Sequence, residues 1–458
     1  MEKSVLQKSR EAYTPKLPKA LRGFVDVKEG KPTQSVGDQD EIKKLFPKTY
    51  GLPLVEFVPG EKKTNEPINV GVILSGGQAP GGHNVISGIF DGIKRLNPEN
   101  RLYGFLMGPG GLVDHNYMEL TSDIIDNYRN TGGFDMIGSG RTKLEKVEQF
   151  EKGREIIEKL GIKALVIIGG DDSNTNACVL AEYYAAKNYG IQVIGCPKTI
   201  DGDLKNDQIE TSFGFDTATK TYSEVIGNIE RDANSAQKYW HFIKLMGRSA
   251  SHIALECALQ CHPNVTIISE EVEKNDTSLD EIVTYIAQAV ADRAADGNNF
   301  GTVLIPEGLI EFIPAIKRLI AELNDLLASE EGKKVEPKDH YNWIKSKLTG
   351  ENAAVYASLP EGVAKQLTME RDPHGNVQVS LIETEKLLSE MVANKLAEWK
   401  KEGKFNGKFA AQHHFFGYEG RCAAPSNYDA DYCYALGISA SELISNGKTG
   451  YMAIVKNT

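Results

Sequence analysis

Four aspartates follow two apolar runs of the sequence. Asp171 and Asp172 come after the run 164–168 and two glycines, and Asp201 and Asp203 lie in CPKTIDGDL, residues 196–204. Adjacent carboxylates raise one another's pKa unless a cation lies near them, and Mg²⁺ bound to a phosphate supplies such a cation. Phosphoryl transfer needs a metal-bound polyphosphate, cations that neutralise charge, and a carboxylate base. The segment that holds Lys198, Asp201 and Asp203 has residue types for all three tasks.

Each of these features also has a structural explanation. Asp172 could cap the helix that follows it, as Ser173 or Asn174 could, because short polar side chains accept hydrogen bonds from helix N-termini. The Asp-Gly-Asp of 201–203 is also a common turn sequence. At the level of single motifs, both explanations stay open.

A glycine-rich segment, SGGQAPGGHN at 75–84, stands between an apolar run and a helical pattern. Glycines let backbone N–H groups approach an anion, and a helix N-terminus adds positive potential. A tight turn between strand and helix is the alternative. The phosphate loop GxxxxGK[ST] does not occur: NGKTG at 446–450 is preceded by Glu442 where that motif needs glycine, so Lys448 is interpreted as a surface turn residue.

The elements that position these motifs alternate between strand and helix. Near-continuous apolar runs, typical of parallel strands covered on both faces, occur at 68–74, 101–107, 164–170, 191–195, 241–247, 264–269 and 300–306. Helical spacing follows several of them, for example at 177–186 and 278–295. This pattern predicts an α/β fold with two doubly wound, mainly parallel sheets and helices on both faces. Ligands of such sheets bind at the carboxyl ends of the strands.

The chain of 458 residues is long enough for several domains. We expect an N-terminal extension at 1–66 and a first α/β domain at 67–215, with part of 425–458 as a candidate for its completion. A second α/β domain is expected at 216–310 and 350–424, with a helical insert at 311–349.

Composition narrows the class of protein. The net charge of -11 argues against broad binding of nucleic acid or of anionic membranes. The N-terminal stretch has no signal-peptide core, and no apolar run approaches the roughly 20 residues of a membrane span. The six cysteines show no CxxC or metal-finger spacing, and Cys257 and Cys261 are interpreted as buried free thiols of a reducing compartment. We expect a cytoplasmic protein.

Three motifs, GGDDS, PKTIDGDL and MGRSASH, occur in an order that resembles the phosphofructokinases, and in particular the pyrophosphate-dependent ones. The resemblance covers nearly the whole chain. It implies transfer of a phosphoryl group from inorganic diphosphate to the 1-hydroxyl of fructose 6-phosphate, Mg²⁺ as the cofactor, and a homodimer or larger assembly. By this resemblance the domain at 67–215 binds diphosphate and the second domain binds fructose 6-phosphate.

The resemblance also implies roles for single residues. On the donor side these are Gly76 and Arg141 near the diphosphate, Asp171 and Asp203 near the metal, Thr199 at the transferred group, and Asp201 as the base. On the sugar side these are Met246, Gly247 and Arg248 as sugar-phosphate contacts, Glu270 at a sugar hydroxyl, Tyr418 and Arg421 at the 6-phosphate, and Lys238 as a weaker candidate there. Lys198 and Arg248 count among the catalytic residues.

The resemblance also gives the paired aspartates a meaning. ATP-using members of the family have glycine at the second position, GGDGS, where the nucleotide needs room. Asp172 fills that room with a negative charge, and Lys198 replaces a small residue where it can pair with a diphosphate oxygen. Repulsion of one donor and attraction of the other together favour diphosphate over ATP.

Alternatives to the diphosphate enzyme are a non-catalytic regulatory subunit of the same fold and an ATP-dependent phosphofructokinase. The intact TIDGD and MGR motifs count against the first, and Asp172 with Lys198 against the second. The family pattern usually continues beyond 449–458, so we expect a shortened form with incomplete packing of the last elements.

Overall fold

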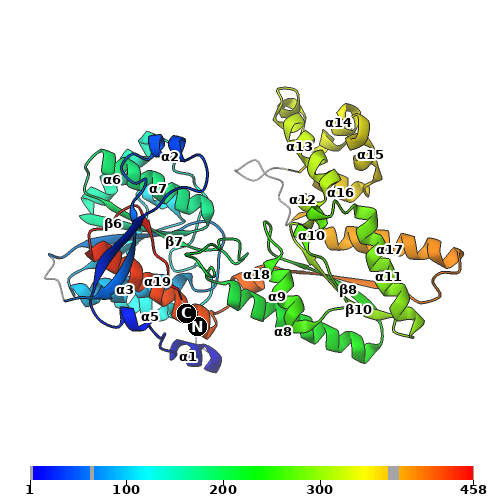
Figure 1. Cartoon of the computed structure of the whole chain (residues 1–458), viewed down its shortest axis with the longest axis horizontal. Coiled ribbons are helices and arrows are strands. Elements are labelled where there is room, and N and C mark those ends of the chain that lie inside the picture. Colours follow the sequence, from blue (N-terminus) through cyan, green and yellow to red (C-terminus); the bar gives the residue numbers. More distant parts are fainter. Residues whose placement is uncertain (1–3, 62–65, 370–380, 457–458) are drawn as a thin grey trace. The chain divides into compact units, whose positions relative to one another are not determined.

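The computed structural model describes residues 4–61, 66–369 and 381–456. The chain divides into two compact units (Figure 1). The first comprises residues 1–218 and 421–458, and the second comprises residues 219–420. The expected extension at 1–66 therefore belongs to the first unit, and the segment 311–349 belongs to the second.

The first unit is built on a six-stranded sheet. Its strands lie in the order β12-β7-β6-β3-β4-β5, and all neighbours are parallel except β4 and β5. The strands are β3 (Asn69–Leu74), β4 (Arg101–Phe105), β5 (Tyr117–Glu119), β6 (Ile162–Gly169), β7 (Gln192–Pro197) and β12 (Tyr451–Met452). The three central strands β3, β6 and β7 are almost wholly buried, which explains why their sequences are continuous apolar runs.

Helices cover both faces of this sheet. In Figure 1, α6 (Val147–Lys159) and α7 (Asp171–Ala186) lie on one side of β6 and β7, and α3 (Gly82–Leu96) and α19 (Asn427–Ser445) lie on the other. Further helices of this unit are α4 (Pro109–Val113), α5 (Ser122–Tyr128) and the start of α8 (Phe215–Ala236). The chain leaves β3 toward β4 and returns to place β6 on the other side of β3. The carboxyl ends of β3 and β6 thus form a switch point, where ligands of such sheets bind.

The segment 4–61 contains secondary structure that its polar sequence did not predict. It holds α1 (Val5–Glu11), a 3-10 turn η1 (Lys19–Leu21), α2 (Gln39–Leu45), and an antiparallel pair of β1 (Val25–Pro32) with β2 (Pro53–Pro59). Glu182 on α7 accepts hydrogen bonds from the backbone N–H groups of Lys48 and Thr49 at 2.9 to 3.0 Å. These bonds fasten the segment to the sheet's helical layer.

The second unit has a smaller parallel sheet in the order β11-β8-β10-β9. Its strands are β8 (Tyr239–Leu245), β9 (Val265–Thr266), β10 (Phe300–Pro306) and β11 (Ala411–Phe416). The main core cluster joins one face of β8 and β10 to α11 (Leu279–Ala295), α13 (Pro314–Ala328) and α17 (Thr384–Lys401). In Figure 1, α8 and α9 (His252–Cys261) lie on the other face.

Short helices complete the second unit. They are α10 (Ser269–Lys274), α12 (Leu309–Phe312), α14 (His340–Lys347), α15 (Gly350–Ser358), α16 (Glu361–Gln366) and α18 (Tyr418–Arg421), with 3-10 turns η2 (Gly332–Lys334) and η3 (Pro337–Asp339). Residues 311–349, which were expected to form a charged helical insert, contain α13, α14 and the turns η2 and η3, so this segment is helical as predicted. None of the described helices in either unit is long and apolar enough to cross a membrane.

Besides the elements of the segment 4–61, two others differ from the sequence-based expectation. The helix predicted at 177–186 begins six residues earlier, at Asp171, because Gly170 occupies the N-cap position and the carbonyl of Gly170 accepts the first helical bond from Asn174. Strand β11 was not predicted. Its residues Gln412 and His413 are exposed and His414 is half-buried, so its pattern lacks the apolar run that marks the other strands.

A buried carboxylate holds α19 against the chain between β7 and α8. Asp429 has no exposed surface, and it accepts hydrogen bonds from the backbone N–H groups of Gly214 and Thr217, both at 2.9 Å, and from the Thr217 hydroxyl. Burial raises the pKa of Asp429 to about 6. Loss of this side chain would leave three buried donors without an acceptor.

We therefore expect Asp429→Ala to lower the free energy of unfolding by about 2–4 kcal/mol, the usual cost of orphaned buried donors. Urea unfolding should be followed by two signals. All three tryptophans (Trp240, Trp343 and Trp399) lie in the second unit, so fluorescence reports that unit, whereas far-UV circular dichroism reports both. The midpoint by circular dichroism should fall more than the midpoint by fluorescence.

The matched control is Asp431→Ala, two residues further along α19. The half-buried Asp431 carboxylate accepts hydrogen bonds from the Tyr13 hydroxyl at 2.8 Å and the Lys16 backbone N–H at 2.7 Å. Its loss should cost about 1 kcal/mol or less, because solvent can replace a partner at a half-buried position. Equal losses for the two variants would contradict the special role of Asp429.

Candidate active site

Lys198 is the centre of the candidate site in the first unit. It directly follows β7, and its backbone N–H donates to the carbonyl of Gly169 at the end of β6, at 2.8 Å. The side chain is only 4% exposed. A lysine at the end of a parallel strand is normally solvated, so its burial requires a special environment.

Two arginines and two aspartates share that environment. The pKa of Lys198 is lowered to about 7, mainly by burial. The positive charges of Arg421 and Arg141 also lower it, while the carboxylates of Asp201 and Asp203 act in the opposite direction. Charges that influence one ammonium in this way lie close to it, so the structure brings four of the predicted site residues together around Lys198.

Glycines form the walls beside the ammonium. A Cβ atom on Gly76 would lie 3.7 Å from Lys198 Nζ, and one on Gly170 would lie 4.0 Å from it. Gly76 has φ of +80°, a conformation that L side chains rarely adopt. The backbone after β3 and the backbone after β6 therefore both pass close to the same positive charge, at the switch point of the sheet.

Arg421, whose positive charge also acts on Lys198, contacts the glycine-rich segment 75–84. Its Nε donates to the carbonyl of Gln78 at 2.7 Å, and a Cβ on Gly77 would lie 2.6 Å from its Nη2. Glycine at position 77 thus leaves the space that the guanidinium occupies. Arg421 belongs to the first unit, whereas its neighbour Tyr418 belongs to the second.

Arg141 is exposed and is held through the residues before it. The carbonyl of Gly140 accepts a hydrogen bond from the Gly76 N–H at 2.9 Å, and the Ser139 hydroxyl donates to the Gly76 carbonyl at 3.0 Å. The segment that carries Arg141 is therefore fastened to the glycine-rich loop.

Asp171 and Asp172 occupy the first turn of α7 and are both exposed. Asp172, which was considered as a possible cap of this helix, lies inside its first turn, because the N-cap position is occupied by Gly170. Carboxylates in a first turn are nevertheless stabilised by the helix dipole. The Ser173 hydroxyl donates to Ser75 Oγ at 2.8 Å, which ties the start of α7 to the end of β3.

The TIDGD segment forms a turn at the carboxyl end of β7. The backbone N–H of Asp201 donates to Thr199 Oγ1 at 3.0 Å, and Gly202 has φ of +74°. The turn explanation is therefore correct as local structure. The carboxylates of Asp201 and Asp203, which this turn carries, both act to raise the pKa of Lys198.

Met246, Gly247 and Arg248 follow β8 in the second unit. The Met246 N–H donates to the carbonyl of Phe416 at 2.9 Å, and Gly247 has φ of +136°. The Gly247 N–H donates to Glu307 Oε2 at 3.0 Å. Glu307 is a buried carboxylate at the end of β10, and our sequence analysis missed it, although the PEG after the run 300–306 follows the same rule as the other motifs.

The remaining predicted residues of the second unit are exposed. Glu270, on α10, accepts a hydrogen bond from the Ser251 N–H at 2.9 Å. Burial acts to raise the pKa of Glu270, but the bonds from Ser251 outweigh it and the pKa lies below its usual value. Tyr418 is 66% exposed, and the Lys238 ammonium lies 5.0 Å from the centre of the Tyr239 ring.

The geometry thus gives two groups, one in each unit. Gly76, Arg141, Lys198, Asp201, Asp203 and Arg421 form the first, with Thr199 and the two α7 aspartates on adjoining backbone. Met246, Gly247 and Arg248 form the second with Glu307. The roles of these residues stay predictions.

Comparison with known proteins identifies the family of the chain. A family model described as phosphofructokinase matches residues 69–444. A protein of Porphyromonas gingivalis named pyrophosphate–fructose 6-phosphate 1-phosphotransferase is 67% identical over 461 residues, covering 100% of this chain and 84% of that protein. A protein of Treponema pallidum with the same name is 53% identical, covering 100% of this chain and 82% of its own.

Solved structures show the same fold. The crystal structure of a pyrophosphate-dependent phosphofructokinase from Nitrosospira multiformis superposes with a TM-score of 0.57 at 18% identity, covering 83% of this chain and 77% of that one. At this identity the likeness concerns the fold alone. The family match over most of the sequence and the full-length relatives establish that the chain belongs to the phosphofructokinase family.

Proposed function

We propose that this protein transfers a phosphoryl group reversibly between inorganic diphosphate and the 1-hydroxyl of fructose 6-phosphate, giving fructose 1,6-bisphosphate and phosphate. The observation that carries the proposal is the buried Lys198 ammonium beside Gly76 and Gly170. A small polyanion would supply the counter-charge that this site needs. The names of the 67% and 53% identical relatives support the same reaction.

On the donor side, Lys198, Arg141 and the backbone amide of Gly170 neutralise the diphosphate. The backbone N–H of Gly76, which was expected to do the same, already donates to the carbonyl of Gly140, so Gly76 lines the site without binding the donor through its amide. Asp172 is exposed in the first turn of α7, beside Gly170. A donor that continues beyond its second phosphate, as ATP does, would bring further negative charge toward this carboxylate. The donor site therefore selects diphosphate by attraction at Lys198 and by repulsion at Asp172.

Asp171 and Asp203 suit a magnesium ion bound together with the diphosphate. No group of three or more metal-ligating side chains occurs in the part of the chain that is described. Mg²⁺ at phosphate sites commonly uses one or two carboxylates and takes its other ligands from phosphate oxygens and water. The two exposed aspartates fit this pattern, and the ion would neutralise charge on the transferred group.

Asp201 acts as the general base that takes the proton of the sugar 1-hydroxyl, and Thr199 contacts the transferred group. Fructose 6-phosphate is held by Met246, Gly247 and Arg248, with Glu270 at a hydroxyl, and Tyr418, Arg421 and Lys238 at the 6-phosphate. Catalysis then consists of positioning and electrostatic stabilisation, without a covalent enzyme intermediate.

Two further inferences concern the protein's setting. All six cysteines are free thiols, which supports a reducing compartment and hence the cytoplasm. Leu255 and Leu259 are 45% and 62% exposed on α9, which supports a contact between two copies in a homodimer. A regulatory subunit without activity is the second candidate, and the intact carboxylates around Lys198 count against it.

Donor choice is tested by initial rates of fructose 1,6-bisphosphate formation with diphosphate and with ATP. We expect the wild type to use diphosphate only, and Asp172→Gly to gain measurable use of ATP because both the charge and the bulk are removed. Asp172→Asn is the matched control that removes charge but keeps size. Use of ATP by the wild type would contradict the donor assignment, and activity with neither donor would favour the regulatory subunit.

The base is tested with Asp201→Asn. The amide keeps the shape of the side chain but accepts no proton, so kcat should fall by about 10²–10⁴-fold, the range typical of a lost general base. The KM for fructose 6-phosphate should stay within about twofold. Asp207→Asn, an exposed aspartate of the same loop, should leave both constants unchanged. An Asp201→Asn enzyme with near-normal kcat would require another base.

The low pKa of Lys198 predicts proton uptake when diphosphate binds. Near pH 8 the ammonium of the free protein is mostly deprotonated, since its pKa is about 7. A bound anion favours the charged form, so binding should take up close to one proton, and affinity should fall by up to about tenfold per pH unit above 7.

Calorimetric titration of diphosphate at pH 8, in buffers of different ionisation enthalpy, measures this uptake. Lys198→Met should remove it and weaken binding. Equal proton uptake by wild type and Lys198→Met would assign the titrating group elsewhere.

A further inference from the structure

Helix α3 contacts both loops of the candidate donor site. It begins directly after the glycine-rich loop that contains Gly76, and its side chains hold a second segment, residues 129–141, which ends at Arg141. We call this second segment the arm. Besides the bonds of Ser139 and Gly140 to Gly76 in the glycine-rich loop, the arm has a set of polar contacts to α3 that none of the proposed catalytic roles uses.

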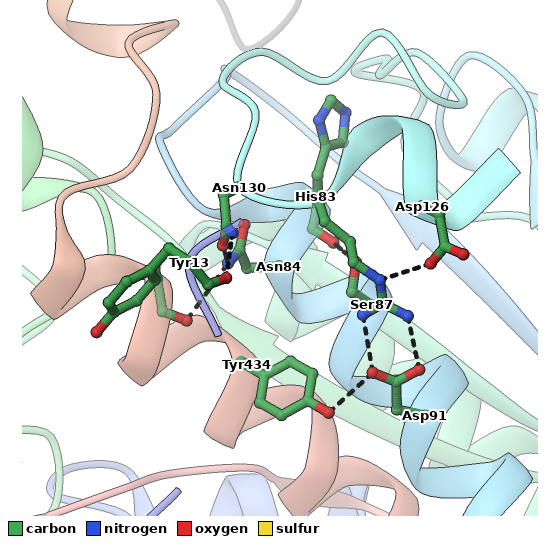
Figure 2. Close-up of polar contacts among 10 residues, drawn as sticks. Tyr13, His83, Asn84, Ser87, Asp91, Asp126, Asn130 and Tyr434 are labelled. Atoms are coloured by element: carbon green, nitrogen blue, oxygen red, sulfur yellow. Dashed lines mark hydrogen bonds and ion pairs between the residues drawn. The ribbon is translucent and has the colours of Figure 1, made fainter. Parts of the chain in front are cut away.

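The base of the arm is fixed by two of these contacts (Figure 2). The guanidinium of Arg129 donates to both carboxylate oxygens of Asp91 on α3, at 2.8 and 2.9 Å. Asn84 Nδ2 donates to Asn130 Oδ1 at 2.7 Å, and Asn130 Nδ2 donates to the carbonyl of Tyr13 at 2.7 Å. These contacts hold the point where the arm leaves α5.

His83 makes the next contacts along the arm, and its side chain has no exposed surface. Its Nδ1 lies 2.8 Å from Thr131 Oγ1, and its Nε2 accepts a hydrogen bond from the Met136 N–H at 3.3 Å. Because the Thr131 hydroxyl donates to the carbonyl of Tyr128 at 2.6 Å, it can accept from Nδ1–H. Both neighbours therefore require the neutral tautomer with the proton on Nδ1.

Two further observations support the neutral state of His83 and the close packing of the arm on α3. Burial lowers the pKa of His83 to about 4, although Asp135 acts to raise it. The imidazole therefore stays neutral, and its Nε2 stays an acceptor, at physiological pH. Beside it, a Cβ atom on Gly82 would lie 2.2 Å from the Phe134 ring, so the arm packs directly on the first turn of α3.

We propose that His83 is a positioning residue for the donor site: by holding Thr131 and Met136 it fixes the arm, and thereby the place of the Arg141 guanidinium relative to Gly76. The inference rests on the proposed function, in which Arg141 binds diphosphate. His83 itself contacts neither substrate. It acts through the backbone between Met136 and Gly140.

Two substitutions separate the contacts of His83. In His83→Gln the amide oxygen can replace Nε2 as the acceptor for Met136, whereas His83→Asn is too short to do so and leaves that N–H without its partner. We expect His83→Asn to raise the KM for diphosphate by about tenfold, the effect of one orphaned buried donor, and to leave the KM for fructose 6-phosphate within about twofold. His83→Gln should restore most of the diphosphate affinity.

A double-mutant cycle with Arg141→Met tests the route of the effect. If His83 acts through Arg141, His83→Asn should add less than about twofold to the diphosphate KM once Arg141 is replaced. Ser87→Ala is the control on the same helix, because the Ser87 hydroxyl donates only within α3, to the carbonyl of His83 at 2.8 Å. It should change neither KM.

Thr131→Val removes the hydrogen-bond partner of His83 Nδ1. It serves as the second variant should His83→Asn not fold, and it should likewise raise the KM for diphosphate without raising the KM for fructose 6-phosphate.

The outcomes are distinguishable. A wild type without diphosphate-dependent activity would contradict the proposed function. With an active wild type, the inference on His83 is overturned if His83→Asn and Thr131→Val leave the diphosphate KM unchanged, if they lower kcat alone, if they raise both KM values equally, or if their effect persists in full in the Arg141→Met background.

Discussion

The burial of one ammonium group is the constraint on which the donor half of the structure depends. Lys198 lies at the end of a central strand, where water cannot reach it freely, and its pKa is lowered to about 7 as a result. Such a group is tolerated only if the surrounding backbone and carboxylates compensate it. The glycines at 76 and 170, the turn with Asp201 and Asp203, and the strand order that brings β3, β6 and β7 side by side all contribute to that environment.

The sequence predicted the parts of the fold that obey simple periodicity. The buried parallel strands β3, β6, β7, β8 and β10 were found because both of their faces are apolar. Strand β11 was missed because polar histidines interrupt its pattern. The pairing of β1 with β2 was missed because neither strand is a continuous apolar run and α2 separates them in the sequence. The early start of α7 was missed because a glycine, rather than a capping side chain, marks its beginning.

Residues of the candidate site were predictable where they belong to motifs that directly follow an apolar strand. Most strand-end motifs were identified, with the segment around Glu307 as the exception, but contacts between distant segments were not predicted. Glu307 supports Gly247 from a different strand, and His83 supports the arm from a helix. Local patterns did not reveal what either residue does, since their partners lie 60 and 53 positions away in the sequence. Arg421 lies beside Gly77 for the same reason, through a contact that only the folded chain creates.

The discontinuity of the first unit has a consequence for biosynthesis. The second unit is one continuous stretch, 219–420, whereas the first needs the segment 421–458 for α19, β12 and Arg421. Chains fold largely in the order in which they leave the ribosome. The second unit can therefore complete its core while the sheet of the first still lacks an edge strand and a covering helix. The nascent first unit would expose the apolar side of α3 until synthesis has passed α19, and this interval is when a chaperone would have most to protect.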